Sequence, residues 1–446
     1  MKTITALALA VVLIPSFALG ESGTVTMREA ITRSLERNHL LKSAVYEQAA
    51  ARSEVAVSRS YYLPRVSVEE GFSASNSPTQ AFMMKLGQGR FVQADFDPPV
   101  LNHPPARDNF RTAFTVEQTL YDRSLGVGLD LSKAEERSKG YTLERSREDV
   151  AFQVFSVCLS VRTAHAYLAS AEQAVKDALE HLRLATLRNE AGIGLKSDEL
   201  RARTFLADME EERISAENTL TLARMRLALL TGGVAGDELD ITGDPAAFAP
   251  PSVQHELVQT ALKARHDLQE VSVAVEKADL GVKMANSAWW PRAFATASYE
   301  LNARDLPFTN DNDAWMVGAG LRWELFDGLR RIDRKDSASA HRDAAAQQLE
   351  RYKKEVSFEV IESMLRRDEA AKRLAVAQGA VSQAEEGVRL IGKRFENSIS
   401  PMVELIDAQT ALNRSRANLI EGESNYALAN GNVYHATGTF LKEVLK

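Results

Sequence analysis

The sequence has 446 residues, a formal net charge of -7 and a single cysteine. The acidic balance argues against a nucleic-acid-binding surface, because such surfaces carry an excess of lysine and arginine. One cysteine excludes an intramolecular disulfide, an iron-sulfur cluster and a cysteine-rich zinc site.

The first 20 residues have the pattern of a secretory signal peptide. Lys2 precedes an apolar run at residues 4–14, and small residues lead to an expected cleavage near Gly20. Beyond this segment, no stretch holds the roughly eighteen consecutive apolar residues of a membrane-spanning helix. If the mature chain enters a membrane, we therefore expect it to do so with β-strands.

The mature chain is predicted to open with a helix followed by two strands. Thr26 and Glu29 have the capping-box spacing that starts a helix, and Pro64 stops it. Apolar and polar residues then alternate, which predicts strands at 65–75 and 109–122. The long segment between the two strands contains several glycines and prolines and is expected to be irregular.

A long helix is predicted next, at residues 124–190. Its apolar residues recur alternately every fourth and every third position from Val150 to Ala185, which is the spacing of a coiled-coil seam. Charged residues between them keep one face polar, so the helix cannot be a membrane span despite its length. Residues 192–197 break this helix, and another is predicted at 197–231 with Ser197 as its cap.

The second half of the chain repeats the first. Adding 206 to the seam positions gives a second seam from Val356 to Ile391, which is apolar at all but two positions. We therefore interpret the chain as an internal duplication, with repeats at 21–233 and 252–446 and a linker at 234–251. The second repeat is predicted to hold a helix, strands at 292–303 and 314–327, a long helix at 330–396 and a helix at 401–438.

Four strands of about ten residues suit the thickness of a bilayer when they are tilted. They are too few to close a transmembrane barrel, which needs at least about eight strands. An open sheet in lipid would leave unpaired edges, so other copies of the chain would have to complete it. Four tryptophans near strand ends fit a membrane aromatic girdle, although each alone could be an ordinary core residue: Trp289, Trp290, Trp315 and Trp323.

In this order, the signal peptide, the duplication and several short motifs resemble the TolC-type outer membrane efflux proteins, the outer membrane factors. The motifs are Leu120-Tyr121-Asp122, its counterpart Leu325-Phe326-Asp327-Gly328, and the stretch from Glu404 to Thr410. The resemblance implies a mainly α-helical chain with a membrane β-barrel part. It implies a homotrimer in which twelve strands form one barrel in outer membrane lipid and twelve helical tracks form a hollow periplasmic cylinder.

The resemblance also implies a function in the cell outer membrane, with a large part of the protein in the periplasm. Such proteins are passive exit ducts of tripartite efflux or type I secretion systems, and they are neither enzymes nor cofactor-binding proteins. A periplasmic adaptor (membrane fusion) protein and an inner-membrane pump supply the substrate and the energy. Whether drugs, metal ions or polypeptides are exported is left open by the sequence.

By the same resemblance, the two helix breaks form a periplasmic tip that contacts the adaptor. The candidate contact residues are Arg188, Gly192, Leu195, Arg394 and Ser400. The alternative is that these residues only turn the helical hairpins, with glycine ending one helix and Ser400-Pro401 starting the next.

The resemblance further implies a pore constriction of acidic residues after the second break. Glu404 and Asp407 stand at the matching positions, and their spacing of three places both on one helical face. In a trimer they would form two carboxylate rings that favour cations. The alternative is that acids in a first helical turn only interact with the helix dipole. The first repeat has Asp198 and Arg201 at the equivalent positions, which leaves the charge of the ring open.

Other candidate functions are less well supported by the sequence. His39 and His266 occupy matched repeat positions, which the duplication explains without a metal site. No Ser-His-Asp order, HExxH or P-loop pattern is present, so we expect no catalytic activity. The main alternative function is a soluble periplasmic coiled-coil adaptor or scaffold. The segment at 76–107 is expected outside the cell, either folded over the barrel mouth or as a plain surface loop.

Overall fold

The computed structural model describes residues 23–234, 236–243 and 253–446. The predicted signal peptide at 1–20 and, in the linker, residue 235 and residues 244–251 lie outside the described residues. The chain forms two compact units. The helical unit holds the chain up to Val45 together with Thr142–Asp267 and Lys353–Lys446, and the strand-bearing unit holds Tyr46–Tyr141 and Leu268–Tyr352. Both units take segments from both predicted repeats.

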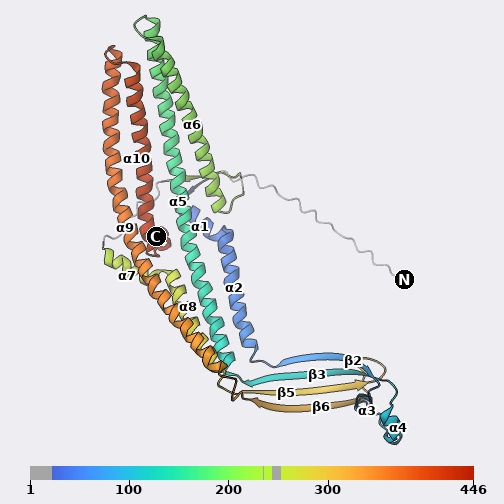
Figure 1. Cartoon of the computed structure of the whole chain (residues 1–446). Helices are drawn as coiled ribbons and strands as arrows, with labels where there is room; N and C mark the ends of the chain where they lie inside the picture. Colours follow the sequence, from blue (N-terminus) through green and yellow to red (C-terminus); the bar gives the residue numbers. More distant parts are fainter. Residues whose placement is uncertain (1–22, 235, 244–252) are drawn as a thin grey trace, which may run out of the picture. The chain divides into compact units, whose positions relative to one another are not determined.

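The strand-bearing unit contains a four-stranded antiparallel sheet with the order β2-β3-β5-β6 (Figure 1). The strands are β2 (Arg65–Ser75), β3 (Arg107–Tyr121), β5 (Arg292–Ala303) and β6 (Asn312–Arg322). β2 and β5 have the predicted bounds, whereas β6 ends earlier than the predicted 314–327. Pairing explains this difference, because Arg322 lies opposite Arg292, the first residue of β5 after Pro291, and no partner remains beyond it.

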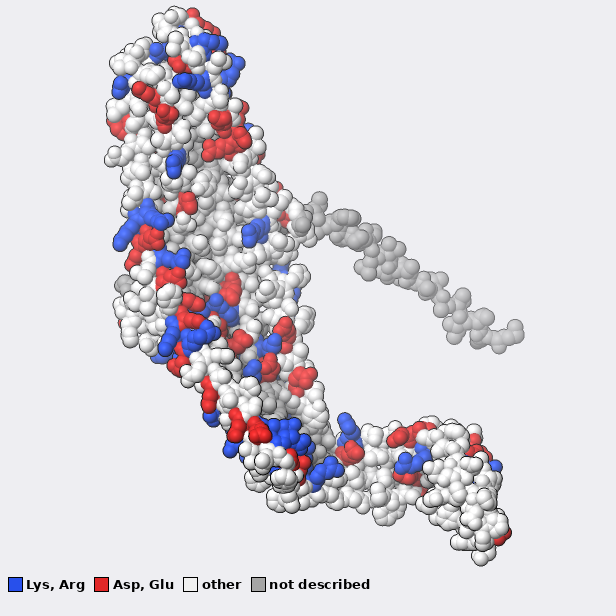
Figure 2. Space-filling view, viewed as in Figure 1, with Lys and Arg blue, Asp and Glu red and all other residues white. Residues whose placement is uncertain are grey.

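The two faces of this sheet differ in polarity. Exposed apolar residues occupy one face, including Val66, Val68, Val317 and Leu321, each more than half exposed. In the view of Figure 2, the region of the strands carries few charged side chains, whereas acidic and basic side chains mix along the helices. Within the part of the chain that the structure describes, no helix combines the length and hydropathy needed to cross a membrane.

The sequence predicted an irregular segment between β2 and β3. The structure instead shows short helices there. These are α3 (Pro78–Gly87), the 3-10 helix η1 (Gln93–Phe96) and α4 (Pro98–Asn102). Proline begins α3 and α4, where its missing N–H costs nothing. Gln88 is buried and donates to Asn109 on β3 (2.9 Å), so the segment is fixed to the sheet.

The four longest helices are α5 (Arg123–Glu190), α6 (Lys196–Leu230), α9 (Arg330–Glu396) and α10 (Met402–Ala436). α6 and α10 belong to the helical unit, as do α5 from Thr142 onward and α9 from Lys353 onward. The predicted seam of α5 is confirmed, because Val150, Val154 and Val161 are at most 4% exposed within the main core. α6 begins at Lys196 with Leu195 as its N-cap, so Ser197 is not the cap.

The seam of α9 is buried less completely than that of α5. Val356 and Val360 are fully buried, but from Arg367 onward the seam positions are half-buried. The polar residue Ser363 is buried and donates to the backbone oxygen of Val360 (2.7 Å). Gly431 of α10 provides the space for Phe155 of α5, since a Cβ at Gly431 would overlap the Phe155 ring.

The predicted opening helix is interrupted, and so is its counterpart in the second repeat. α1 (Met27–Arg37) and α2 (His39–Ser60) are separated by Asn38 in an extended conformation. α7 (Gln254–Ala264) and α8 (His266–Ser287) are separated by Arg265 in the same way. Neither break contains proline or glycine, so the interruption comes from tertiary contacts described below.

Three further elements were not predicted. The short strand β1 (Gly23–Thr26) pairs in parallel with β4 (Leu239–Thr242), inside the predicted linker. Asp240 of β4 accepts hydrogen bonds from His165 (2.9 Å) and Arg224, which fixes this strand to α5 and α6. The chain ends in a short helix, α11 (Phe440–Val444), whose Phe440 is fully buried in the main core.

Candidate functional site

The turns that join α5 to α6 and α9 to α10 have the same backbone geometry. In the first turn Gly192 has a φ of +74°, and the N–H groups of the two residues after it donate to the carbonyl of Arg188. In the second turn Ser398 has a φ of +62°, and the next two N–H groups donate to the carbonyl of Arg394. Glycine adopts this left-handed conformation without strain, whereas serine does so at some cost.

Arg188 connects the first turn to the second. Its guanidinium donates to the carbonyl of Phe395 and to the hydroxyl of Ser398 (2.8 Å). The same guanidinium lies 4.5 Å from the centroid of the Phe395 ring, within cation-π distance. Phe395 is 2% exposed in an apolar cluster that includes Ala185 and Met402. The guanidinium of Arg188 is therefore bound to partners within the chain.

Arg394, the repeat counterpart of Arg188, is exposed, and no described residue forms an ion pair or hydrogen bond with its guanidinium. Ser400 is only 5% exposed, and its hydroxyl has no partner among the described residues. The five residues predicted at the tip therefore lie together at the two turns, but Ser400 is covered and Arg188 points into the second turn.

Large apolar side chains are exposed at both turns. Ile193, Leu195 and Ile399 are each about two-thirds exposed, at 67%, 66% and 65%. Of these three residues, only Leu195 is among the candidates predicted from the sequence. The two isoleucines were visible in principle, because they occupy equivalent positions of the repeats at turns where polar residues are the usual choice.

Glu404 and Asp407 lie on one exposed face of α10, near its start. The opposite face is buried through Met402, Leu405 and Gln409, each at most 2% exposed. Within the described ranges, neither carboxylate takes part in an ion pair or a side-chain hydrogen bond. Two unpaired acids, one turn apart, are thus held in a fixed direction by the buried face of the same helix.

The equivalent positions of the first repeat are built differently. Asp198 is half-buried, and Arg201 is exposed. Glu199 between them is 4% exposed and accepts hydrogen bonds from Lys196 (2.7 Å) and Asn189 (2.9 Å). The hydrogen bond from Lys196 is the main reason that the pKa of Glu199 lies below its ordinary value. This acid is bound within its own hairpin and is not free to face a pore.

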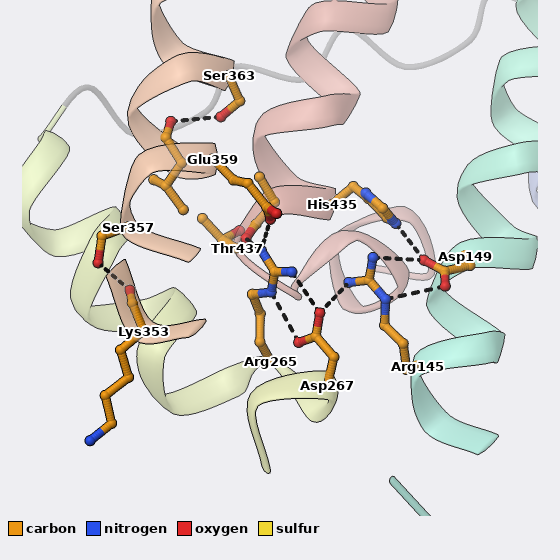
Figure 3. Close-up of polar contacts among 12 residues, drawn as sticks. Arg145, Asp149, Arg265, Asp267, Lys353, Ser357, Glu359, Ser363, His435 and Thr437 are labelled. Atoms are coloured by element: carbon orange, nitrogen blue, oxygen red, sulfur yellow. Dashed lines mark hydrogen bonds and ion pairs between the residues drawn. The ribbon is translucent and has the colours of Figure 1, made fainter. Parts of the chain in front are cut away.

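A polar network surrounds the helix interruption at Arg265 (Figure 3). Arg265 is 3% exposed and donates to Asp267 (2.6 Å), to Glu359 and to the carbonyl of Ala436 (3.4 Å). Burial alone would lower the pKa of Arg265, but its hydrogen bonds to the two carboxylates outweigh burial and raise it. The network caps the end of α10 and is structural.

The first repeat has a smaller version of the same contact. The side chain of Asn38 donates to the carbonyl of Leu230 (3.5 Å), the last residue of α6, and Ser34 donates to the same carbonyl (2.9 Å). In both repeats the residue that interrupts the early helix therefore satisfies the end of the last helix. This explains the interruptions at Asn38 and Arg265, which the sequence pattern did not reveal.

The histidines at matched positions are not gathered into a metal site. His39 is exposed, and among the described residues no group of three or more His, Cys, Asp or Glu side chains could hold a metal ion. The candidate functional features are therefore the two turns, the acids of α10 and the sheet.

The family model described as "Outer membrane efflux protein" matches residues 30–233 and 257–439, one segment in each repeat. The chain belongs to the outer membrane efflux protein family. Membership places this efflux protein in the outer membrane with a helical extension in the periplasm. Proteins of this family are transport proteins and not enzymes, which favours an efflux role over the alternative of a soluble adaptor or scaffold. Membership also implies a trimeric efflux assembly.

Curated relatives and a solved structure agree with this assignment. The efflux protein is 22% identical to the solvent efflux pump outer membrane protein SrpC of Pseudomonas putida over 279 residues, which cover 62% of this chain and 59% of SrpC. It is 22% identical to the outer membrane protein TolC of Vibrio cholerae, covering 97% of this chain and 96% of that one. A membrane protein from Pseudomonas aeruginosa shares the fold, with a TM-score of 0.77, 17% identity and coverage of 92% and 93%.

Proposed function

We propose that the protein is the passive exit duct of a tripartite efflux or type I secretion system and works as a homotrimer. The supporting observation is the sheet itself, whose edge strands β2 and β6 each pair with another strand on one side only within the described chain. Exposed apolar edges favour association with other strands. Pairing β6 of one copy with β2 of the next would give twelve strands in three copies and leave no edge in the lipid.

The tip at the two turns is the proposed contact with a periplasmic adaptor, which in turn connects the duct to an inner-membrane pump. Ile193, Leu195 and Ile399 offer apolar contact area, and Gly192 and Arg394 lie exposed beside them. Arg188 serves by connecting the two turns, and Ser400 contributes its backbone N–H, which donates to the carbonyl of Arg394. The exposed apolar groups favour this role over a simple turn, because a turn alone does not need them.

Glu404 and Asp407 are the proposed pore constriction. Their support is that both acids are exposed, unpaired and fixed on one face of α10 near the tip. Three copies would place six carboxylates in two rings, which narrow the passage and favour cations.

Purification in mild detergent tests the duct. We expect a mass of three chains by light scattering and single-channel conductance after insertion into a planar bilayer. Recovery of the protein from the soluble periplasmic fraction without detergent, or a monomer without conductance, would contradict the proposal. For the tip, a photo-crosslinking amino acid at position 195 should capture the adaptor in cells, whereas one at the exposed position 211 of α6 should not.

A further inference from the structure

The polar face of the sheet contains a hollow at the end where the strands meet the helices. Its volume is about 790 Å³, and all of its lining residues belong to the strand-bearing unit. The residues that give it its chemistry come from all four strands: Arg65, Glu117, Arg292, Phe294 and Arg322.

The strand register places these side chains on one face. Arg65 lies opposite Glu117, Glu117 lies opposite Thr296, and Arg292 lies opposite Arg322. Because alternate residues of a strand share a face, Arg292, Phe294 and Thr296 point to the same side. The apolar residues Val66 and Leu321 belong to the other side. The hollow is thus on the face that would line the passage of the proposed barrel.

Positive charge in the hollow is only partly balanced, because three arginines share the carboxylates of Glu117 and Asp122. Two arginines directly opposite each other, such as Arg292 and Arg322, destabilise a sheet. Arg292 has a carboxylate nearby in Asp122, at 3.4 Å. Arg65 and Arg322 are exposed, and within the described chain neither has a carboxylate within 4.0 Å. Unpaired guanidinium groups of this kind are suited to carboxylate, sulfonate or phosphate groups.

An aromatic wall adjoins the arginines. The Phe294 ring lies over Gly320 on β6, and a Cβ at position 320 would overlap the ring. Glycine is therefore required for this ring position. Leu63, another lining residue, is 65% exposed. A site with guanidinium groups beside an aromatic wall fits an anion that carries an apolar, preferably aromatic, body.

Two of the arginines lie on the edge strands of the sheet. Their joint role rests on the proposed trimer. Arg65 is the first residue of β2 and Arg322 is the last residue of β6, so both lie at the same end of the sheet on its two edges. Joining β6 of one copy to β2 of the next would bring Arg322 near Arg65 of the neighbouring copy. We propose that each of the three seams forms a binding site for aromatic organic anions in transit through the duct.

Channel block tests this site. Naphthalene-1-sulfonate added to the wild-type trimer in a planar bilayer should reduce its conductance. For the double variant R65Q/R322Q, the sulfonate concentration that halves the conductance should be about tenfold higher. The variant R65K/R322K keeps the charge and should retain most of the block. The control R304Q removes an exposed arginine beyond the other end of β5. Naphthalene-1-sulfonate should block this variant at the same concentration as it blocks wild type. Block by the matched cation naphthalene-1-methylammonium should not weaken in R65Q/R322Q.

The outcomes separate the site from the channel. A conducting wild type whose sulfonate block is the same in R65Q/R322Q overturns the anion site and leaves the duct intact. Equal weakening in R304Q also overturns it, because the effect would then be one of general surface charge. A wild-type protein that forms trimers but never conducts contradicts the proposed duct, and the anion site falls with it.

Discussion

Glu404 and Asp407, the proposed constriction, are the two residues that we expect to set the permeability of the channel. Replacing both with alanine removes six carboxylates from the trimer, so we expect higher single-channel conductance and a weaker preference for cations. Reversal potentials in a salt gradient measure the preference. The control is D208A/E211A, which removes two exposed acids with the same spacing from α6. Unchanged conductance and selectivity in E404A/D407A would remove these residues from the constriction.

Glu148 is a buried carboxyl whose charge opposes folding. It is 7% exposed, and burial raises its pKa above the ordinary 4.5 although the backbone N–H of Leu441 donates to it (3.0 Å). Since the folded state favours the protonated form, stability is lost as the pH rises from the unfolded pKa through the folded pKa and stays low above it. At neutral pH, E148Q removes this cost and keeps an acceptor for Leu441.

We therefore expect E148Q to unfold at a higher temperature than wild type at pH 7.5. The difference should shrink towards zero as the pH is lowered below 4.5, where both states of the wild-type carboxyl are protonated. Circular dichroism in detergent over this pH range provides the measurement. If the difference in unfolding temperature grew on acidification, the pKa of Glu148 would be lowered by folding and not raised. E144Q, a half-exposed neighbour on α5, serves as the control.

At the scale of elements, Arg188 links the turns of the two helical hairpins. The variant R188A loses the hydrogen bonds to Phe395 and Ser398 and the contact with the Phe395 ring. We expect amide hydrogen exchange in the second turn to become about tenfold faster, with little change in the rest of α9 and α10. R394A, at the exposed equivalent position, should leave exchange in the isolated subunit unchanged. Equal exchange in R188A and wild type would refute the link.

The sequence predicted elements well wherever the signal was local. Pro64 and the alternation after it define β2, and the 3.5-residue spacing defines the buried seam of α5. The end of β6 depends on where β5 begins, and the interruption at Asn38 depends on the carbonyl of Leu230. Information of this kind lies far away in the chain, so a local pattern cannot contain it.

The candidate site was predictable to a similar extent. Gly192 and the Ser400-Pro401 pair marked both turns, and the acid spacing in α10 was evident. The contact from Arg188 to the second turn was not, because it joins residues 207 positions apart. The burial of Ser400 was also hidden, since its sequence context is that of an exposed turn.

At the scale of the whole molecule, the two repeats are alike in backbone and unequal in burial. The seam of α5 is enclosed by its own chain, whereas that of α9 remains half-buried from Arg367 onward. A half-buried apolar seam is expected to gain cover on assembly. In the proposed trimer the first repeat therefore stabilises the subunit, and the second has apolar surface left for its neighbours.

The pairing of Phe155 with Gly431 makes the two repeats non-equivalent in the core. Subtracting 206 from 431 shows that the first repeat has Met225 where the second has Gly431. A ring of six identical first halves would place phenylalanine against methionine at this contact, and the core has no room for both. The two halves of the chain are therefore not interchangeable at this contact.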